Sequence, residues 1–327
     1  MVNLNDIAKI AGVNVSTVSR ALKDSPSISP ETKEKIMQIA LKNGYVSKKR
    51  HMHHKTIGVI VPETISHYYA KLAANLENVI YKNQYHTIIS ITDFDLTKLT
   101  QSLNMMVEHG VEGIVVDISA SRGARGDALR TIMKCKVPLV VVCEKEVDCE
   151  RDCVYLNYQS GVESVVRHLT DLGHQKISYI GDELSRARRE AFQEACIKFG
   201  CQVVGIMEGP ERFEKGGYLQ MKRLLGSAEK PTAVLASYDQ FAVGALKALD
   251  EAGICVPQDI SIAGFDNIDM DDYLLCPLTS VTNPVEKIGE IAVKILINKI
   301  ENPEDLTVQH VALQPSLVIR ETTGVKK

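Results

Sequence analysis

The chain has 327 residues, 45% of them hydrophobic and 24% charged, which is typical of a soluble globular protein and excludes a disordered or fibrous one. Its 38 Lys and Arg against 41 Asp and Glu give a formal net charge of −3, a value that by itself argues against a nucleic-acid partner. The longest apolar run, 137–143, is too short to cross a membrane, and the N-terminus lacks the layout of a signal peptide. We therefore expect a cytoplasmic protein.

The charge is distributed unevenly along the chain. Residues 1–56 carry ten basic and four acidic side chains, a charge of +6, so residues 57–327 carry −9. A small basic segment is thus joined to a large acidic one, and the average of the two conceals a candidate nucleic-acid-binding segment.

Apolar spacing and capping residues predict three short helices in the basic segment. Asn3 and Gly12 bound the first helix, Asn14 can cap a second over 15–22, and Ser29 precedes a third. Only three residues separate the first two helices, which predicts a helix-turn-helix.

The second of these helices is the candidate DNA-reading element. In helix-turn-helix docking its first turns face the major groove. There Arg20 would bind guanine or a phosphate, and Val15 would contact a thymine methyl group. The alternative is a solvated helical hairpin with a surface arginine. The predicted DNA contacts of the head are Asn5, Val15, Ser16, Thr17, Ser19 and Arg20.

From Ile57 onward, apolar strand-like runs alternate with amphipathic helical stretches. Eight such runs occur, at 57–62, 87–92, 113–119, 138–143, 177–181, 203–207, 233–237 and 260–266. Continuous apolar strands separated by helices predict parallel sheets covered on both faces. Their spacing fits either a barrel or two open sheets.

The chain has eight cysteines but no CxxC pair, so neither a zinc site nor a disulfide framework is expected. His51, His53 and His54 can be read as metal ligands or as part of a basic linker, and we favour the linker. No metal and no cofactor are predicted.

Several motifs, in order along almost the whole chain, resemble the lactose-repressor (LacI) family. They are DIAKIAGVNVSTVSRAL in the basic segment, then IGVIVPE, HLTDLGHQKISYIG, KPTAVLASYDQFAVGALKAL, VPQDISIAGFDNID and PLTSVTNPVEKIGEIAV. The resemblance implies an N-terminal all-α helix-turn-helix head and an α/β type I periplasmic-binding-protein-like body of two Rossmann-like subdomains, with a ligand cleft between them. It also implies a homodimer, whose two heads would read a pseudo-palindromic double-stranded DNA operator.

The resemblance also divides the chain into domains. The predicted ranges are 1–46 for the head, 47–56 for a shortened basic linker and 57–327 for the effector-binding and dimerisation domain. Within that domain, 57–157 with 285–312 is the expected N-subdomain, and 158–282 with 313–327 is the expected C-subdomain. The chain is expected to cross between subdomains near Tyr158, 282–284 and 312–315.

Effector contacts follow from the resemblance residue by residue. Arg188, four residues before Phe192, matches an arginine that holds a ligand's polar groups, and Asp266 matches an aspartate that accepts its hydrogen bonds. The aromatic candidates can alternatively be core residues. The predicted effector contacts are His67, Tyr68, Tyr69, Arg188, Phe213, Tyr238, Asp239 and Asp266.

Three positions depart from the sugar-binding members of the family. Tyr238 stands where asparagine is common, and Cys143 and Leu156 stand where aspartate is frequent. Losing these polar groups removes hydrogen bonds to sugar hydroxyls. The ligand is therefore expected to be a less hydroxylated molecule or a phosphorylated one, or to be absent.

The linker departs as well. Eleven residues separate Tyr45 from Ile57, and they lack the proline, alanine and leucine of the family's hinge helix. We expect the hinge to fold weakly or not at all. We also expect the basic side chains of the linker to contact DNA phosphates. These predicted contacts are Lys48, Lys49, Arg50 and Lys55.

Together these features predict a sequence-specific DNA-binding transcription regulator, a repressor controlled by a small-molecule effector such as a sugar or related metabolite. The alternatives are a ligand-activated or corepressor-dependent regulator, and an enzyme on a doubly wound fold. An enzyme of that kind would need a nucleophile elbow, a Walker A loop or a GxGxxG turn, and the sequence contains none of them. We predict no catalytic residues and no membrane partner.

Overall fold

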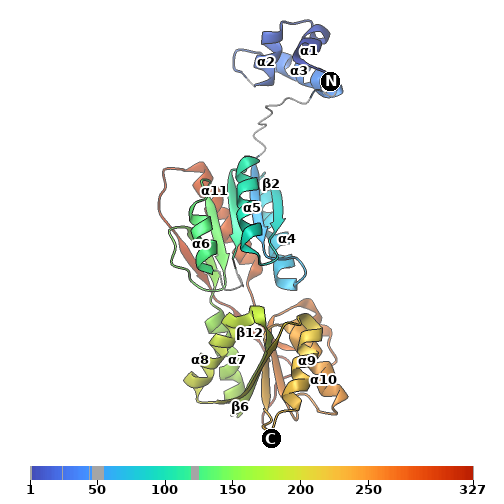
Figure 1. The fold of residues 1–327 in the computed structure, drawn as a ribbon, viewed down its shortest axis with the longest axis vertical. Helices are drawn as coiled ribbons and strands as arrows, with labels where there is room; N and C mark the ends of the chain where they lie inside the picture. The colour runs from blue at the N-terminus through green and yellow to red at the C-terminus, as the bar shows by residue number, and fades with distance from the viewer. Residues whose placement is uncertain (1, 24, 44, 46–54, 119–124, 327) are drawn as a thin grey trace. The chain divides into compact units, whose positions relative to one another are not determined.

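The computed structural model describes residues 2–23, 25–43, 45, 55–118 and 125–326 (Figure 1). They fall into two compact units, 1–54 and 55–327, each with its own hydrophobic core. No helix in these described ranges is long and apolar enough to span a membrane.

The first unit contains the three predicted helices, α1 (Leu4–Ala11), α2 (Val15–Leu22) and α3 (Pro30–Lys42). Asn3 and Asp6 form a capping box at the start of α1, and Gly12 ends it in the left-handed conformation, with φ 69°. Ile7, Val18 and Ile36, one from each helix, are buried against one another. A core of alanine and β-branched side chains thus holds the three short helices in one bundle.

The first sheet of the body is parallel and has the strand order β11-β5-β4-β3-β1-β2. Its strands are β1 (Thr56–Val61), β2 (His86–Ile91), β3 (Gly113–Asp117), β4 (Leu139–Cys143), β5 (Asp152–Leu156) and β11 (His310–Leu313). Helices α4 (His67–Lys82) and α11 (Val285–Glu301) pack on one face, and α5 (Leu96–Glu108) and α6 (Arg125–Met133) on the other. Every residue of β3 and β4 is buried, as expected for central strands covered on both faces.

The second sheet has the order β12-β10-β9-β8-β6-β7, parallel except for the antiparallel pair β10 and β12. Its strands are β6 (Lys176–Asp182), β7 (Gln202–Gly209), β8 (Ala233–Ala236), β9 (Ser261–Asp266), β10 (Thr279–Thr282) and β12 (Ser316–Val318). Figure 1 shows α7 (Tyr158–Asp171) and α8 (Arg186–Phe199) on one side of this sheet, and α9 (Phe213–Leu225) and α10 (Asp239–Glu251) on the other. Two short 3₁₀ helices, η1 (Glu183–Ser185) and η2 (Asp269–Tyr273), follow β6 and β9.

Two open six-stranded sheets exclude the barrel arrangement. The chain passes from one sheet to the other between β5 and α7, between β10 and α11, and between β11 and β12. Parallel strands place their carboxyl ends at one edge of each sheet, and the polar residues that follow these ends line the cleft described below.

Candidate functional site

Helix α2 of the first unit presents a polar face to solvent. Val18 and Ala21 hold the opposite face in the core, so Val15, Ser16 and Arg20 are exposed. Thr17 and Ser19 are half-buried beside them, and Asn5 of α1 is also exposed. The structure therefore brings all six predicted head contacts to accessible or partly accessible positions.

The start of α2 lacks a side-chain cap. Asn14 occupies the predicted N-cap position, but its side chain makes no capping hydrogen bond within the described head. Its carbonyl oxygen instead accepts from the amides of Thr17 and Val18, at 2.9 and 3.1 Å. The earliest amides of α2 are thus left to solvent or to an anion, and a DNA phosphate is an anion that helix N-termini bind.

A cleft lies between the two sheets of the body, with a cavity of about 50 Å³. Aromatic and charged side chains from both halves meet there. The cleft is lined by Ser66, Tyr68, Tyr69, Phe94, Glu144, Tyr158, Asp182, Leu184, Ser185, Ala187, Arg188, Arg212, Tyr238 and Asp266.

Arg188 is the central charged residue of the cleft. Its guanidinium donates to Asp266 Oδ1 at 3.1 Å and to the carbonyl oxygen of Ser237 at 2.5 Å. The same group lies between two rings, 4.6 Å from the centroid of Tyr158 and 4.5 Å from that of Phe265. Stacking and hydrogen bonding fix the guanidinium in one orientation, which is what a polar ligand contact requires.

Asp266 is held in an unusual environment at the end of β9. Its φ of 109° is rare for a residue with a side chain, and its Oδ1 accepts from both Arg188 and Asn283. Burial raises the pKa of Asp266 to about 7, although Arg188 opposes the shift. The carboxyl group can therefore accept or donate a hydrogen bond near neutral pH.

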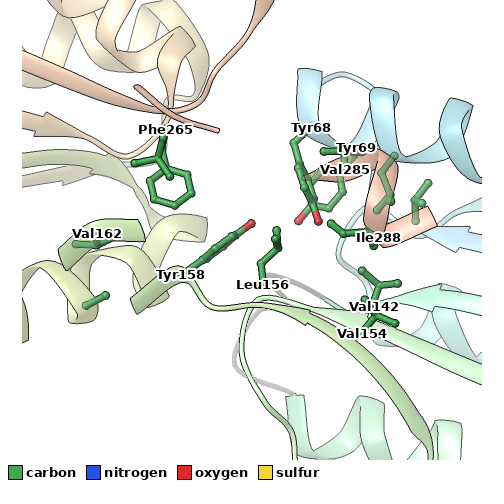
Figure 2. Close-up of a cluster of buried hydrophobic side chains, with 14 of the residues drawn as sticks. Tyr68, Tyr69, Val142, Val154, Leu156, Tyr158, Val162, Phe265, Val285 and Ile288 are labelled. Carbon is green, nitrogen blue, oxygen red and sulfur yellow. The ribbon is translucent and has the colours of Figure 1, made fainter. Parts of the chain in front are cut away.

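Two hydroxyl groups in the cleft have no hydrogen-bond partner among the described residues. Ser66 Oγ and the Tyr68 hydroxyl are buried and make no hydrogen bond to any residue that the structure describes. Figure 2 shows the hydroxyl ends of Tyr68, Tyr69 and Tyr158 turned toward the same space between the two halves. Because buried hydroxyls are rarely left unpaired, these groups can donate hydrogen bonds to a polar ligand in the cleft.

Comparisons with known proteins match both units. The family description "Bacterial regulatory proteins, lacI family" matches residues 3–48, and "Periplasmic binding protein-like domain" matches residues 166–323. The ribose operon repressor of Haemophilus influenzae is 32% identical to this chain, over 98% of each protein. The chain belongs to the lacI family of bacterial regulatory proteins.

Solved structures of lacI-family proteins share the fold. A transcriptional regulator from Enterococcus faecium with bound ribose is 29% identical, covers 84% of this chain and 100% of its own, and has a TM-score of 0.71. A lac repressor dimer bound to operator and the anti-inducer ONPF is 24% identical, covers 99% of each chain and has a TM-score of 0.81. The predicted fold is confirmed, and the chain is a transcription regulator of this family.

The predicted effector contacts of this lacI-family chain divide into two groups. Five of them line the cleft, namely Tyr68, Tyr69, Arg188, Tyr238 and Asp266. His67, Phe213 and Asp239 do not line it. Asp239 is fully buried behind the cleft, where its carboxylate accepts from Ser280 Oγ at 2.6 Å and from the Ile268 amide at 3.1 Å. Phe213 packs edge-on against Tyr238.

The three departures from the sugar-binding pattern lie in different places. Tyr238 donates to Asp182 at 2.8 Å within the cleft. Cys143 and Leu156 are buried core residues, and Cys143 lies against Cys153 with the sulfur atoms 3.3 Å apart. In the described part of the chain the cysteines are free, and no three His, Cys, Asp or Glu side chains gather as metal ligands.

The linker prediction lies mostly outside the described residues, since Lys48, Lys49 and Arg50 fall within 46–54. Lys55 begins the second unit, is exposed, and places its ammonium group 5.1 Å from the centroid of the Tyr85 ring.

The sequence prediction missed several residues of the cleft, above all Phe94, Asp182 and Arg212. It also missed Glu63, which does not line the cavity but pairs with Arg212. Glu63 follows β1 by two residues, and Asp182 is the last residue of β6. The rule that ligands bind at the carboxyl ends of parallel strands would have selected both acids. Arg212 lies in the turn after β7, where the sequence shows an ordinary charged loop.

A buried pair of acids lies behind the cleft. Asp239 and Asp271 are both inaccessible to solvent. Burial raises the pKa of Asp271 to about 6, and burial together with the neighbouring Asp271 raises the pKa of Asp239 well above its ordinary value. The pair therefore retains a proton at a pH where exposed aspartates have lost theirs.

Asp271→Asn is expected to change how stability depends on pH. The pKa of Asp271 is about 6 in the folded chain and about 4 in the unfolded chain. The raised pKa therefore stabilises the fold fully below about pH 4, and this contribution is lost as the pH rises through about 6. The free energy of unfolding of the variant should equal that of the unchanged chain near pH 4 and exceed it by about 1 to 3 kcal/mol near pH 8. Urea unfolding at both pH values measures the difference. Exposed Asp269→Asn is the control, and an equal gain in that variant would contradict the assignment.

Proposed function

We propose that the chain is a homodimeric, sequence-specific repressor that binds a pseudo-palindromic operator through α2 and is controlled by a small effector in the cleft. The observation that carries the DNA-binding part is the division of α2 into a buried apolar face and an exposed face bearing Val15, Ser16 and Arg20. This division matches the way in which a recognition helix is held by its core and presented to the major groove.

The same proposal assigns the domains. The head spans about 1–46, the linker 47–56 and the body 57–327, with the body divided at its three passages between the sheets. Support comes from the strands, since β1 to β5 and β11 form one sheet and β6 to β10 and β12 the other. The basic linker residues would contact phosphates on either side of the operator.

The effector is proposed to be a sugar or a related metabolite. Support comes from the buried hydroxyls of Ser66 and Tyr68, which have no partner in the described part of the chain, and from the fixed Arg188–Asp266 pair. Together they offer donors and an acceptor to a small polar ligand. Two of the relatives point to ribose, one as a ribose operon repressor and the other with ribose bound.

Arg20→Ala is expected to remove sequence preference from DNA binding. One bidentate contact to a guanine contributes about 1 to 3 kcal/mol of discrimination, so the ratio of specific to non-specific affinity should fall roughly 5- to 150-fold. The operator is first obtained by selection from random-sequence DNA with the full chain. Mobility shift on the selected and scrambled sequences then gives the ratio.

Lys35→Ala is the matched control for this experiment. It removes the same charge from an exposed position on a different helix, α3. We expect it to leave the affinity ratio unchanged. An Arg20→Ala protein that keeps its full ratio would rule out Arg20 as a base-reading residue.

A further inference from the structure

The Arg212 guanidinium joins the two halves of the body across the cleft. It donates to both carboxylate oxygens of Glu63, at 2.7 and 2.8 Å, in the bidentate geometry of a strong ion pair. Its Nε donates to Asp182 at 3.3 Å. Glu63 follows β1 of the first sheet, whereas Asp182 ends β6 of the second. One side chain therefore ties the two sheets together.

Aromatic rings hold the same guanidinium on both sides of the cleft. It lies 4.5 Å from the centroid of Phe213, which begins α9, and 5.5 Å from that of Phe94, which precedes α5 in the first half. Phe213 thus has a role although it does not line the cavity, because it supports Arg212 from its own half of the body.

This ion pair is shielded from water. The Glu63 side chain is 5% exposed and that of Arg212 is 25% exposed. Ion pairs on the surface contribute little because water and salt screen them. A pair buried to this degree is screened much less, so breaking it leaves a buried carboxylate without its partner.

The pair also limits the space available to a ligand. Arg212 lines the cavity of about 50 Å³, whereas ligand sites commonly have roughly 300 to 1,000 Å³. While Arg212 stays on Glu63, its guanidinium therefore occupies part of the space that a sugar-sized ligand would need.

We propose that Glu63 and Arg212 form an internal latch that holds the two sides of the cleft together, and that the effector must break this latch to bind. The inference rests on the proposed function in one respect, namely that the cleft takes the effector. The latch places the chain in a closed state that does not admit ligand, and the apparent affinity falls by the fraction of molecules in the open state. Arg212 and Glu63 thus set the effector concentration to which the regulator responds.

Glu63→Gln tests the latch in the full-length chain, because glutamine keeps the shape of the side chain and removes its charge. We expect the cleft to open more often, so that amide hydrogen exchange in segments 62–66 and 210–214 accelerates on the order of tenfold. Arg212→Gln should accelerate exchange in the same two segments, and the double variant should add little to either single change. Wild-type exchange rates in folded Glu63→Gln protein would overturn the latch.

Glu208→Gln is the matched control. Glu208 of β7 accepts from Arg189 of α8 at 2.7 Å, with side chains that are 21% and 28% exposed, so the pair resembles the latch in distance and in the exposure of its arginine. Both residues lie in the second half of the body, and their pair does not cross the cleft. Exchange in segment 62–66 should therefore remain unchanged in this variant, and an acceleration equal to that of Glu63→Gln would overturn the proposal.

Calorimetric titration with D-ribose tests the competition. Tighter binding to Glu63→Gln than to the unchanged chain supports the latch, since the variant no longer has to break the pair. Equal or weaker binding to the variant overturns the competition. If D-ribose binds to neither protein, ribose as the effector is contradicted, and the exchange experiment still decides whether the latch exists.

Discussion

Arg188→Met is expected to lower the free energy of unfolding of the body by roughly 3 to 5 kcal/mol and to abolish the response to the effector. Methionine keeps the apolar packing between the rings of Tyr158 and Phe265 but loses every hydrogen bond of the guanidinium. Asp266 is then left as a largely buried carboxylate that still accepts a hydrogen bond from Asn283. Urea unfolding measures the loss of stability.

A double variant separates the structural role of this pair from its role in effector binding. Asp266→Asn combined with Arg188→Met removes both charges, and a neutral pair in a buried site is often as stable as the ion pair it replaces. Asparagine also tolerates the positive φ at position 266 better than most residues. We expect the double variant to regain most of its stability and to remain insensitive to the effector.

The effector response is measured with a ligand found by thermal-shift screening of sugars, sugar phosphates and nucleobases, since a ligand of the folded state raises its melting temperature. Arg186→Ala is the control. Its ion pair with Glu190 is exposed, so the cost should stay below about 1 kcal/mol and the response should persist. A stable double variant that still responds to the ligand would exclude Arg188 and Asp266 as effector contacts.

The fold was largely predictable because hydrophobic patterns are local. All eight predicted strands occur, as do the three helices of the head. The strands β5, β10, β11 and β12 were missed because their sequences, DCVYL, TSVT, HVAL and SLV, are short and partly polar. Pairing with distant partners stabilises them, as when β11 pairs with β5, and no local pattern records such pairing.

The sequence predicted which segments of the chain reach the cleft, but not always which residue of each segment lines it. Tyr238 faces the cleft, whereas Asp239, one position later at the start of α10, turns into the core. Arg212 and Phe213 differ in the same way at the start of α9. Arg212 and Tyr238 are extended N-cap residues, whereas Phe213 and Asp239 begin the helices, so the direction of the side chain changes where the helix starts. An error of one position therefore exchanges a residue that lines the cleft for one that packs behind it.

The latch lay beyond sequence reasoning for another reason. Glu63 and Arg212 are 149 positions apart, and they meet only because β1 and β7 end at facing edges of two separate sheets. Each of these side chains by itself has the pattern of an ordinary surface charge. Their pairing follows from the arrangement of the two halves, which the motifs imply in outline only.

Gly244→Ala is expected to destabilise the second half of the body by roughly 3 kcal/mol or more, because there is no space for a methyl group between α9 and α10. A Cβ atom at Gly244 would lie 1.9 Å from the carbonyl oxygen of Glu214, and one at Gly217 would lie 1.9 Å from that of Phe241. These obstacles are backbone atoms, so the helices themselves would have to separate.

Separating these helices would also disturb the cleft, since α9 starts directly after Arg212 and α10 directly after Tyr238. We therefore expect Gly244→Ala to lose both stability and effector binding, as measured by urea unfolding and by thermal shift. Gly126→Ala on α6 is the control, because the nearest atom there is an arginine nitrogen at 3.7 Å and alanine favours a helix by about 1 kcal/mol over glycine. Equal stability of the two variants would show that α9 and α10 do not depend on their glycine contact.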